Sequence, residues 1–566
     1  MVIYIPSLNQ VQAILAALPP EHVVMVLFVF AMPLAVMLFV LKSVIIGILR
    51  VVGLSHPAHY ARLPCVPWRL PFAIWTGFCL WFEQVRKIGK HHTGGFAGVL
   101  GMFSLRYRSG CVLLGRATMA GFGTVVPVGL KITRHVFCYA MTGGGKTTWL
   151  ISMLGCWQGS AWLIDPKGQV TEALARCDKR RWYVLAPYEP NISAQWNPFD
   201  DIKMAIARGE DAVKWSMRLA EALIVTPAGS KSPYFTDTSR GFVSSLILHI
   251  LSFHEAKDHN LPYMRTLILE GYCVTDEAGN IDTTPEEARA LLYKLMRENP
   301  AFNHAIAGGA AGFESASGET EGNLLSTLQE QTKWLDIPSV QHMLMATTCP
   351  LSALKIRDDV VLSFVAPVLS IKEELKPLVR ALTNFTVYTF ESVKRKKGQC
   401  LTIVDELQAQ GYNKTLEVVL PVARSYGQVF VGIAQDMEGM KSSYPNTYQG
   451  FTGNADAVLW MGSNHQSNLK HLSAVLGRKT IVKRDPQTGR ESAHTQAVAD
   501  EDQLSRLLDP ERGNLIVTRA GKRPLLLKNE PYFKALPVSV YDSDPDHKEP
   551  ILRALMRFLI NRKPSK

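Results

Sequence analysis

The sequence lacks the cysteine patterns that are typical of disulfide-bonded domains and of metal sites. Its 566 residues include nine cysteines, which are scattered and never form a C-x-x-C pair. This spacing argues against a disulfide framework and against a cysteine metal site. Cys138 and Cys400 lie in apolar segments, where a free thiol packs like a small hydrophobic side chain. We therefore expect most of the chain to fold in a reducing compartment.

Lysine and arginine are missing from residues 1–22, and all charge is missing from residues 23–41. As a helix the uncharged run would be about 29 Å long, close to the hydrocarbon thickness of a bilayer, so it predicts a transmembrane helix. A signal peptide is the rival interpretation, but no basic segment precedes the run and no small-residue cleavage site follows it. Because Lys42 and Arg50 follow the run, the positive-inside rule predicts an external N-terminus and a cytoplasmic remainder.

Acidic residues are in modest deficit, since the formal net charge is +12. Such a charge suits anionic lipid or polynucleotide as a partner and proves neither. The basic clusters at residues 179–181 and 394–397 are expected to be solvated turns, because the interleaved aromatic side chains that bind single strands are not evident. No repeat of fixed period occurs, and the length allows three or four domains.

A glycine run follows a short apolar strand in HVFCYAMTGGGKTT, residues 135–148. Successive glycines let the backbone curl so that its N–H groups point inward at phosphate oxygens. Lys146 would add a positive charge, and Thr147 a hydroxyl ligand for Mg²⁺. The usual pattern begins with glycine, which Ala140 replaces here. The residues predicted to bind the nucleotide at this turn are Thr142, Gly143, Gly144, Gly145, Lys146, Thr147 and Thr148.

A second apolar strand ends in two consecutive carboxylates, in LTIVDELQAQG, residues 401–411. Asp405 is a predicted magnesium ligand, together with Thr147, and Glu406 is predicted to orient and deprotonate the attacking water. Alternatively, Asp405 caps the following helix and Glu406 lies in its first turn, where the helix dipole favours acidic side chains. The upstream glycine turn favours the first interpretation.

Two further positions fit a P-loop ATPase of the RecA-like type, which the sequence resembles at this point. Gln435 ends an apolar strand, and its amide would sense the γ-phosphate between the two motifs. Arg424 follows the helix predicted after Glu406 and could be an arginine finger that reaches the neighbouring subunit's nucleotide. Otherwise Arg424 is a basic residue at a helix C-terminus, which the macrodipole favours.

The ordered motifs resemble the coupling ATPases of type IV secretion and conjugation, the TraG/TraD-like family, over residues 112–533. Besides the two motifs above, the resemblance rests on AWLIDPKGQV at residues 161–170, WNPFD at 196–200, ADAVLWMGSN at 455–464, LSAVLGRKT at 472–480 and LLLKNEPYF at 525–533. Ala140 and Gln169 depart from the family pattern, in which an acid occupies the place of Gln169.

The resemblance implies a bacterial inner-membrane ATPase, facing the cytoplasm, that forms a homo-hexamer with ATP and Mg²⁺ between neighbours. It would recruit relaxase-bound single-stranded DNA, effector proteins, or both, to a type IV secretion channel and drive their transfer by ATP hydrolysis. Functional side chains gather at the carboxyl ends of parallel strands, so Asp165 and Lys167 are predicted to touch the nucleotide or the subunit interface, unless Lys167 lies in a surface turn. Residues 70–82 are apolar but short for a span, and the resemblance implies that they form a second membrane span in contact with lipid, which would place both termini in the cytoplasm.

Two other classes stay open. A DNA-pumping translocase of cell division or sporulation would share the RecA-like core, although the DPKG and LGRKT segments argue against it. A non-enzymatic substrate receptor with a vestigial nucleotide site would be expected to have lost Lys146 or Glu406, and both are present.

The expected fold is an α/β, RecA-like P-loop ATPase with a mainly parallel sheet, an inserted all-α domain and an N-terminal transmembrane anchor. Residues 307–318, rich in Gly, Ala and Ser, are predicted to form a flexible loop. Predicted strands occupy residues 111–114, 125–128, 136–139, 162–165, 362–366, 402–405, 429–435, 458–461 and 515–518. The predicted divisions are an N-terminal segment 1–22, an anchor 23–95, a nucleotide-binding domain 96–203 and 349–535, an all-α domain 204–348 and a tail 536–566.

Overall fold

The computed structural model describes most of the chain beyond the predicted membrane anchor. The described residues are 96–97, 101–102, 104–118, 125–226, 233–274, 282–316, 318–394, 398–484 and 491–542. The predicted spans at residues 23–41 and 70–82 lie outside these ranges. Within the ranges, no helix combines the length and the apolar character that crossing a bilayer requires.

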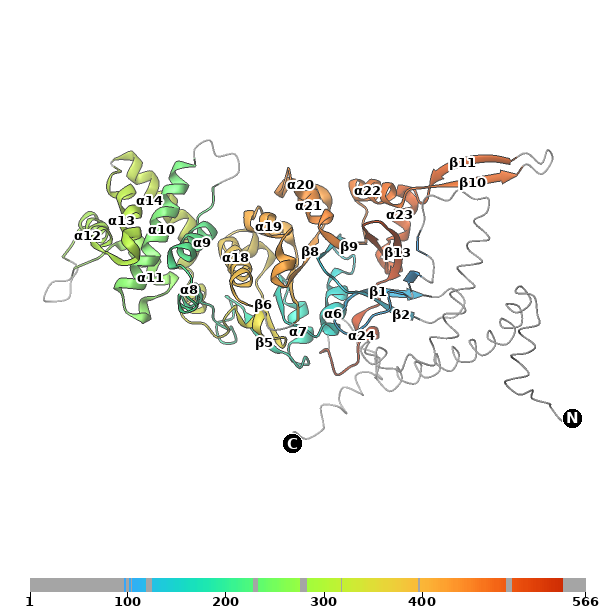
Figure 1. Cartoon of the computed structure of the whole chain (residues 1–566), viewed down its shortest axis with the longest axis horizontal. Helices are drawn as coiled ribbons and strands as arrows, with labels where there is room; N and C mark the ends of the chain where they lie inside the picture. The colour runs from blue at the N-terminus through green and yellow to red at the C-terminus, as the bar shows by residue number, and fades with distance from the viewer. Residues whose placement is uncertain are drawn as a thin grey trace, which may run out of the picture.

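An eleven-stranded sheet forms the body of the molecule, with strand order β2-β1-β13-β12-β9-β3-β8-β7-β4-β6-β5 (Figure 1). Its strands are β1 Val112–Thr118, β2 Val125–Leu130, β3 His135–Ala140, β4 Ala161–Ile164, β5 Arg181–Leu185, β6 Val360–Phe364, β7 Cys400–Val404, β8 Gln428–Ala434, β9 Ala455–Met461, β12 Asn514–Arg519 and β13 Lys522–Lys528. From β9 to β5 in this order, neighbouring strands are parallel. The strands β2, β1, β13 and β12 form an antiparallel flank, which joins the parallel part through β12 and β9.

The predicted mainly parallel sheet is confirmed, with a correction at this flank. Residues 515–518 were expected in the parallel core, but they lie in β12, which runs antiparallel to β9 and β13. The cause is a tight turn at Gly521, whose φ of 66° lets β12 and β13 form a hairpin. The sequence prediction missed β13 and β5, and also two strands outside this sheet, at residues 478–484 and 491–497. Arg181, expected in a solvated turn, begins β5.

Helices cover both faces of the sheet, and alternate side chains of each strand point to opposite faces. In β3, Cys138 belongs to the buried cluster that contains helix α6 (Lys146–Cys156), whereas Phe137 and Tyr139 belong to the cluster that contains helix α18 (Lys376–Ser392). The strands β3, β4, β6, β7 and β8 are buried along their whole length. Continuous burial is typical of parallel strands between two helical layers.

The helices are α6 Lys146–Cys156, α7 Gln169–Leu174, α8 Pro198–Ala207, α9 Ala212–Leu223, α10 Tyr234–Phe253, α11 Leu261–Glu270, α12 Pro285–Glu298, α13 Ala305–Glu314, α14 Glu319–Thr332, α15 Pro338–Met343, α16 Ala353–Ile356, α17 Val368–Lys372, α18 Lys376–Ser392, α19 Lys414–Val419, α20 Met437–Ser443, α21 Tyr448–Gly453, α22 Gln466–Leu476, α23 Glu501–Leu507 and α24 Tyr532–Ala535. Short 3-10 helices are η1 Ala256–Asp258, η2 Ala301–His304, η3 Lys333–Asp336, η4 Leu407–Gln410, η5 Ala423–Tyr426 and η6 Pro510–Arg512.

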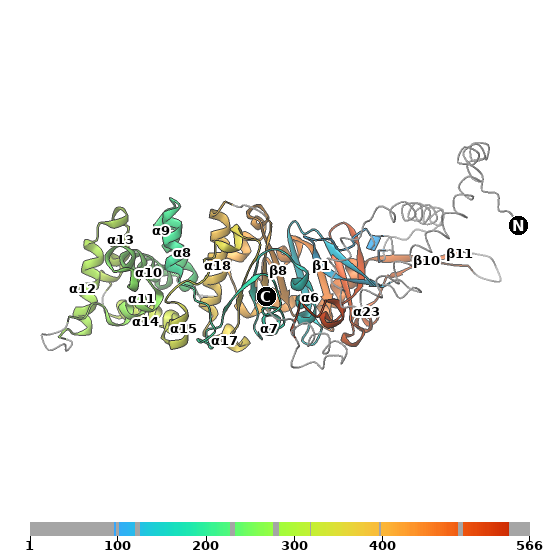
Figure 2. The same cartoon turned by 90° about the horizontal axis from the view of Figure 1, so that it is seen from below.

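The described residues between β5 and β6 form helices and no strands, and helices α9 to α15 extend the molecule to the left in Figures 1 and 2. The helical spacing in the sequence is confirmed here. Trp215, Leu219 and Leu223 are buried on one side of α9. The same spacing buries Phe242 and Ile250 on α10. We call this part of the chain, from α8 to α15, the helical segment.

The prediction of a flexible loop at residues 307–318 is wrong, because Ala305–Glu314 form α13. The small residues serve a close helix contact instead. A Cβ atom added to Gly309 would lie 2.1 Å from the Ser245 Oγ atom and 2.6 Å from the Gly241 carbonyl oxygen, both on α10. The glycine therefore allows α13 to approach α10 more closely than any other residue would permit.

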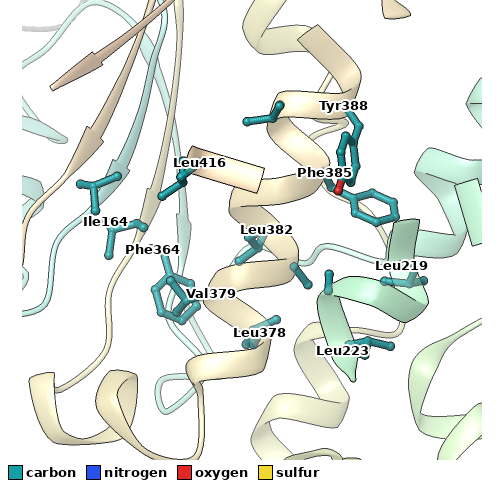
Figure 3. Close-up of a cluster of buried hydrophobic side chains, with 14 of the residues drawn as sticks. Ile164, Leu219, Leu223, Phe364, Leu378, Val379, Leu382, Phe385, Tyr388 and Leu416 are labelled. Atoms are coloured by element: carbon teal, nitrogen blue, oxygen red, sulfur yellow. The ribbon is translucent and has the colours of Figure 1, made fainter. Parts of the chain in front are cut away.

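Helix α18 joins the sheet to the helical segment (Figure 3). Its side chains Leu378, Val379 and Leu382 share one buried cluster with Phe364 of the sheet and Leu219 of α9. Farther along α18, Phe385 packs edge-on against Trp215 of α9, with ring centroids 5.5 Å apart. The apolar contact between sheet and helical segment is therefore continuous.

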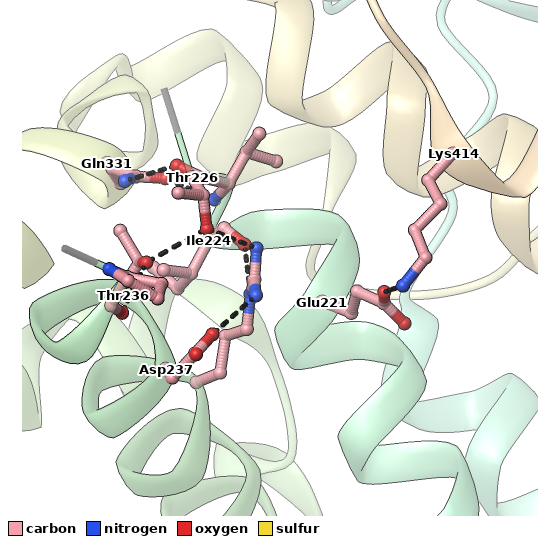
Figure 4. Close-up of polar contacts among 10 residues, drawn as sticks. Glu221, Ile224, Thr226, Thr236, Asp237, Gln331 and Lys414 are labelled. Carbon is pink, nitrogen blue, oxygen red and sulfur yellow. Dashed lines mark hydrogen bonds and ion pairs between the residues drawn. The ribbon is translucent and has the colours of Figure 1, made fainter. Parts of the chain in front are cut away.

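Hydrogen bonds and an ion pair also connect α9 and the residues after it to neighbouring helices (Figure 4). The Gln331 side chain of α14 bonds both backbone groups of Val225, donating to the carbonyl oxygen at 2.9 Å and accepting from the N–H at 2.5 Å. Arg240 of α10 donates to the Ile224 carbonyl oxygen at 2.8 Å. Across the junction, the Lys414 Nζ atom of α19 lies 3.4 Å from Glu221 Oε1 of α9.

The chain enters and leaves the helical segment at neighbouring points. The Thr348 backbone N–H donates to the Gln195 carbonyl oxygen at 2.9 Å. The Trp196 backbone N–H donates to the Met343 carbonyl oxygen, also at 2.9 Å. The Trp196 indole also donates to the buried Asp201 carboxylate at 2.7 Å. We call these contacts the clasp.

At the opposite end, β10 Arg478–Arg484 and β11 Glu491–Ala497 form a separate two-stranded sheet that projects beyond α22 and α23 (Figures 1 and 2).

Candidate nucleotide site

The glycine turn forms a cradle between the end of β3 and the start of α6. Gly143 and Gly145 adopt left-handed conformations, with φ of 79° and 88°. Gly144 lies against the end of β9, because an added Cβ atom would be 3.2 Å from the Met461 carbonyl oxygen. The start of α6 directs free backbone N–H groups and the positive end of the helix dipole toward this cradle. Thr142 is exposed, while Thr147 and Thr148 are half-buried in the first turn of α6.

Lys146 joins the two predicted motifs. Its Nζ atom donates to Glu406 Oε2 at 2.9 Å and lies 3.4 Å from Asp405 Oδ1. Burial works against the charge on this lysine, but the two carboxylates outweigh burial and raise the pKa of Lys146. Residues 260 positions apart in the sequence therefore meet at one edge of the sheet.

Gln435 completes this group. It follows β8, which lies between β3 and β7 in the sheet, so its amide emerges between the two motifs. The Gln435 Nε2 atom donates to Glu406 Oε1 at 2.9 Å, so both carboxylate oxygens of Glu406 are bonded. Glu406 also has a φ of 65°, a left-handed conformation that is rare for a residue other than glycine.

Asp405 has the features of a buried cation ligand. Its side chain is 9% exposed, and its Oδ1 atom accepts no hydrogen bond in the described part of the chain. Burial raises the pKa of Asp405, while the neighbouring Lys146 acts against that rise. A carboxylate oxygen here and the Thr147 hydroxyl are hard ligands of the kind that Mg²⁺ prefers.

Asp165 and Lys167 follow β4, on the same edge of the sheet as the cradle. The Asp165 carboxylate accepts from the Thr171 N–H at 2.8 Å and from its hydroxyl at 2.9 Å, so it holds the first turn of α7. Burial raises the pKa of Asp165 to about 6, against those hydrogen bonds. The Lys167 side chain is exposed on the turn before α7. Among the described residues, neither side chain forms a hydrogen bond or ion pair with the glycine turn.

Arg424 is an exposed residue of η5, the 3-10 turn that precedes β8. The sequence places it at the end of a helix, but α19 ends at Val419, before η5 begins. Exposure leaves its guanidinium free to meet another molecule.

Sequence reasoning missed Asn529 at this site. Its Nδ2 atom donates to the Gly145 carbonyl oxygen at 2.9 Å, although the two residues are 384 positions apart. Asn529 lies in the motif LLLKNEPYF, residues 525–533, but nothing in this motif indicates a contact with the glycine turn.

Comparison with known proteins agrees with this geometry. The family model "Type IV secretory system Conjugative DNA transfer" matches residues 106–554. Two conjugal transfer proteins TraG from Escherichia coli are 26% and 24% identical to the chain over 440 and 447 residues. Each alignment covers 71% of this chain and 67% of the relative.

Solved structures of the conjugative coupling protein TrwB share the fold. TrwBdeltaN70 in complex with sulphate superposes with a TM-score of 0.56 at 15% identity, over 77% of this chain and 93% of that chain. TrwB in complex with ADP and Mg²⁺ gives a TM-score of 0.55 at 17% identity, over 78% and 93%. The family match spans most of the sequence, and the chain therefore belongs to the type IV secretory system conjugative DNA transfer family, the coupling-protein family that its motifs resemble.

Proposed function

We propose that the chain is an ATPase that binds ATP with Mg²⁺ and uses its hydrolysis to drive DNA into a type IV secretion channel. The observation that carries the proposal is the meeting of Lys146 with Asp405 and Glu406, in a chain of the conjugative DNA transfer family. TrwB, which shares the fold, has been solved with ADP and Mg²⁺ and with non-hydrolysable analogues of ATP and GTP.

Each side chain has a defined part in the proposed reaction. The backbone N–H groups of the cradle and Lys146 bind the β- and γ-phosphates. Glu406 orients the attacking water and accepts its proton, and Gln435, bonded to Glu406, reports the state of the γ-phosphate. Arg424 acts on the nucleotide of the adjacent subunit.

Asp405 and Thr147 would hold the magnesium ion, which when bound neutralises charge on the β- and γ-phosphate oxygens. The buried Oδ1 atom of Asp405 supports this assignment, because it accepts no hydrogen bond and its ion pair with Lys146 is long, at 3.4 Å, so a cation could become a closer partner. The ion pairs to Lys146 keep the two carboxylates compensated when no nucleotide is bound.

The assembly and its setting are part of the proposal. We infer a homo-hexamer in the bacterial inner membrane, anchored by residues 23–41 and 70–82, with the sheet and helical segment in the cytoplasm. The family match favours relaxase-bound single-stranded DNA as cargo over effector proteins. The helical segment, reached through the clasp, would meet cargo and relaxase, while the anchor meets the channel proteins.

Replacing Lys146 tests this function. Lys146→Ala should abolish ATP hydrolysis and DNA transfer in a protein that still folds, with a lower unfolding midpoint because Asp405 and Glu406 lose their compensating charge. The matched control is Lys372→Ala, an exposed lysine on α17, which should keep both activities. Hydrolysis by Lys146→Ala at the wild-type rate would refute the assignment.

A further inference from the structure

The loop after β13 reaches the phosphate cradle at one point. Asn529 donates from Nδ2 to the Gly145 carbonyl oxygen at 2.9 Å. The contact is close enough that a Cβ atom added to Gly145 would lie 2.6 Å from Nδ2. The orientation of the amide is fixed by chemistry, because its own oxygen in that place would face another oxygen.

The Gly145 carbonyl oxygen accepts two hydrogen bonds. One comes from Asn529, and the other comes from the Trp149 N–H at 3.0 Å, in the first turn of α6. The same carbonyl shares a planar peptide unit with the N–H of Lys146, which points the opposite way because the peptide is trans. Holding the Gly145 oxygen therefore fixes the direction of the Lys146 N–H at the open start of the helix, where phosphate binds.

Gly145 needs such a restraint. Its φ of 88° lies in a region where glycine has wide backbone freedom, and no side chain caps the start of α6. The Trp149 bond alone allows the peptide plane to tilt about the helix axis. A second donor from a different part of the fold removes that freedom.

The loop that carries Asn529 is itself firmly held. The Asn529 N–H donates to the Gly513 carbonyl oxygen at 2.8 Å. The next residue, Glu530, pairs with the buried guanidinium of Arg116 on β1, with Nε and Oε2 at 2.8 Å. Arg116 also donates to the Ala535 carbonyl oxygen at 3.0 Å. The amide is thus attached to the antiparallel flank and not to a free loop.

We propose that Asn529 is a positioning residue of the nucleotide site, through which the antiparallel flank sets the direction of the Lys146 N–H. The inference rests on the proposed nucleotide binding and adds a residue that acts through the backbone of Gly145. Its loss weakens nucleotide binding without removing any group that touches the phosphates.

The test compares two asparagines of the same flank in the full-length protein. Asn529→Asp replaces the donor by an acceptor of the same shape. Asn514→Asp is the matched control, because Asn514 Nδ2 donates to the Leu507 carbonyl oxygen at 2.8 Å, away from the cradle. Affinities for a fluorescent ATP analogue and for ADP are measured by titration, and unfolding midpoints by calorimetry.

Asn529→Asp should bind both nucleotides about tenfold more weakly than the wild type, since a hydrogen bond is lost and two oxygens face each other. Asn514→Asp should bind within about twofold of the wild type, with a similar unfolding midpoint. If Asn529→Asp does not fold, Asn529→Ala carries the same expectation without the added charge.

Wild-type affinity in both Asn529→Asp and Asn529→Ala would overturn the positioning role and leave the proposed function standing. Equal weakening in the Asn514→Asp control would also overturn it, because the effect would then be a general loss of stability. A wild-type protein that binds neither nucleotide would overturn both proposals.

Discussion

At the scale of single residues, Glu406 combines a strained backbone with a fully bonded carboxylate. Its left-handed φ of 65° is costly for a residue with a Cβ atom, and such strain persists where neighbours fix the side chain. Here Lys146 holds one carboxylate oxygen and Gln435 the other. This backbone conformation places the Glu406 carboxylate between the Lys146 ammonium and the Gln435 amide.

Glu406→Gln should bind nucleotide but hydrolyse it at least about 100-fold more slowly, because an amide keeps the shape of the side chain and cannot accept the proton of water. Nucleotide affinity and kcat are measured on the same preparation. Glu417→Gln is the control, since Glu417 is a more exposed acid on α19 whose carboxylate accepts a hydrogen bond from the Tyr412 hydroxyl. Wild-type kcat in Glu406→Gln would exclude Glu406 as the base.

Residues of the site could be predicted where they belong to a local pattern. The glycine turn, the paired acids and the strand-ending Gln435 each carry such a pattern, and the structure brings Lys146, Asp405, Glu406 and Gln435 together. Asn529 could not be found in this way, because its partner is a backbone carbonyl that any sequence would provide. Asp165 lies at the end of a strand as predicted, but its carboxylate accepts hydrogen bonds from the N–H and hydroxyl of Thr171, six residues later.

At the scale of elements, the contact between α10 and α13 makes a sharp prediction. Gly309→Ala should destabilise the helical segment by about 1–3 kcal/mol, because the new methyl group would meet the α10 backbone and Ser245. Gly308→Ala is the matched control, since nothing lies within 4 Å of the added atom and alanine favours helix. Thermal unfolding and limited proteolysis check this pair.

Unchanged unfolding in Gly309→Ala would show that the two helices can separate at no cost. Nucleotide hydrolysis should be the same in both variants, because α13 lies far along the chain from the cradle and on the helical side of the clasp.

Strands that are buried on both faces were easier to predict from the sequence than strands at the edge of the sheet. Strands buried on both faces gave continuous apolar runs, and all the predicted strands overlap observed ones. Strand β5 was missed because it is an edge strand, with Arg181 exposed and its next three residues only half-buried. The glycine-rich α13 was misassigned because sequence cannot distinguish a glycine that bends the chain from one that admits a neighbouring helix.

At the scale of the whole molecule, the clasp predicts a pH dependence. Burial raises the pKa of Asp201 from 3.8 to about 7, against hydrogen bonds from Trp196 and Leu351. The folded protein then binds a proton that the unfolded chain has released, so stability falls as pH rises from about 4 to about 7. The loss is at most about 4 kcal/mol, since one pKa unit corresponds to about 1.4 kcal/mol.

Asp201→Asn removes the ionisation, so its unfolding midpoint relative to the wild type should be higher at pH 8 than at pH 5. Asp200→Asn, one residue earlier in the same helix and not buried, should show no such change. Calorimetry at the two pH values measures the unfolding midpoints of both variants and the wild type. Parallel pH profiles for Asp201→Asn and the wild type would contradict the prediction.

Arg424 is predicted to act between subunits. Arg424→Ala alone should lose about 10³-fold or more in hydrolysis. Co-expression with Lys146→Ala should restore part of it, because a subunit with an intact cradle can then meet a neighbour with an intact arginine. No recovery in the mixed assembly, with both variants folded, would argue against action in trans.

The paired crossing points of the chain at Gln195 and Thr348 have an evolutionary consequence. These two residues are hydrogen-bonded to each other, so the two ends of the inserted part lie side by side. A different insert whose ends are equally close could be joined at the same two points. Another helical insert could therefore take the place of residues 196–347, provided that it also covers the apolar side of α18 that α9 covers here.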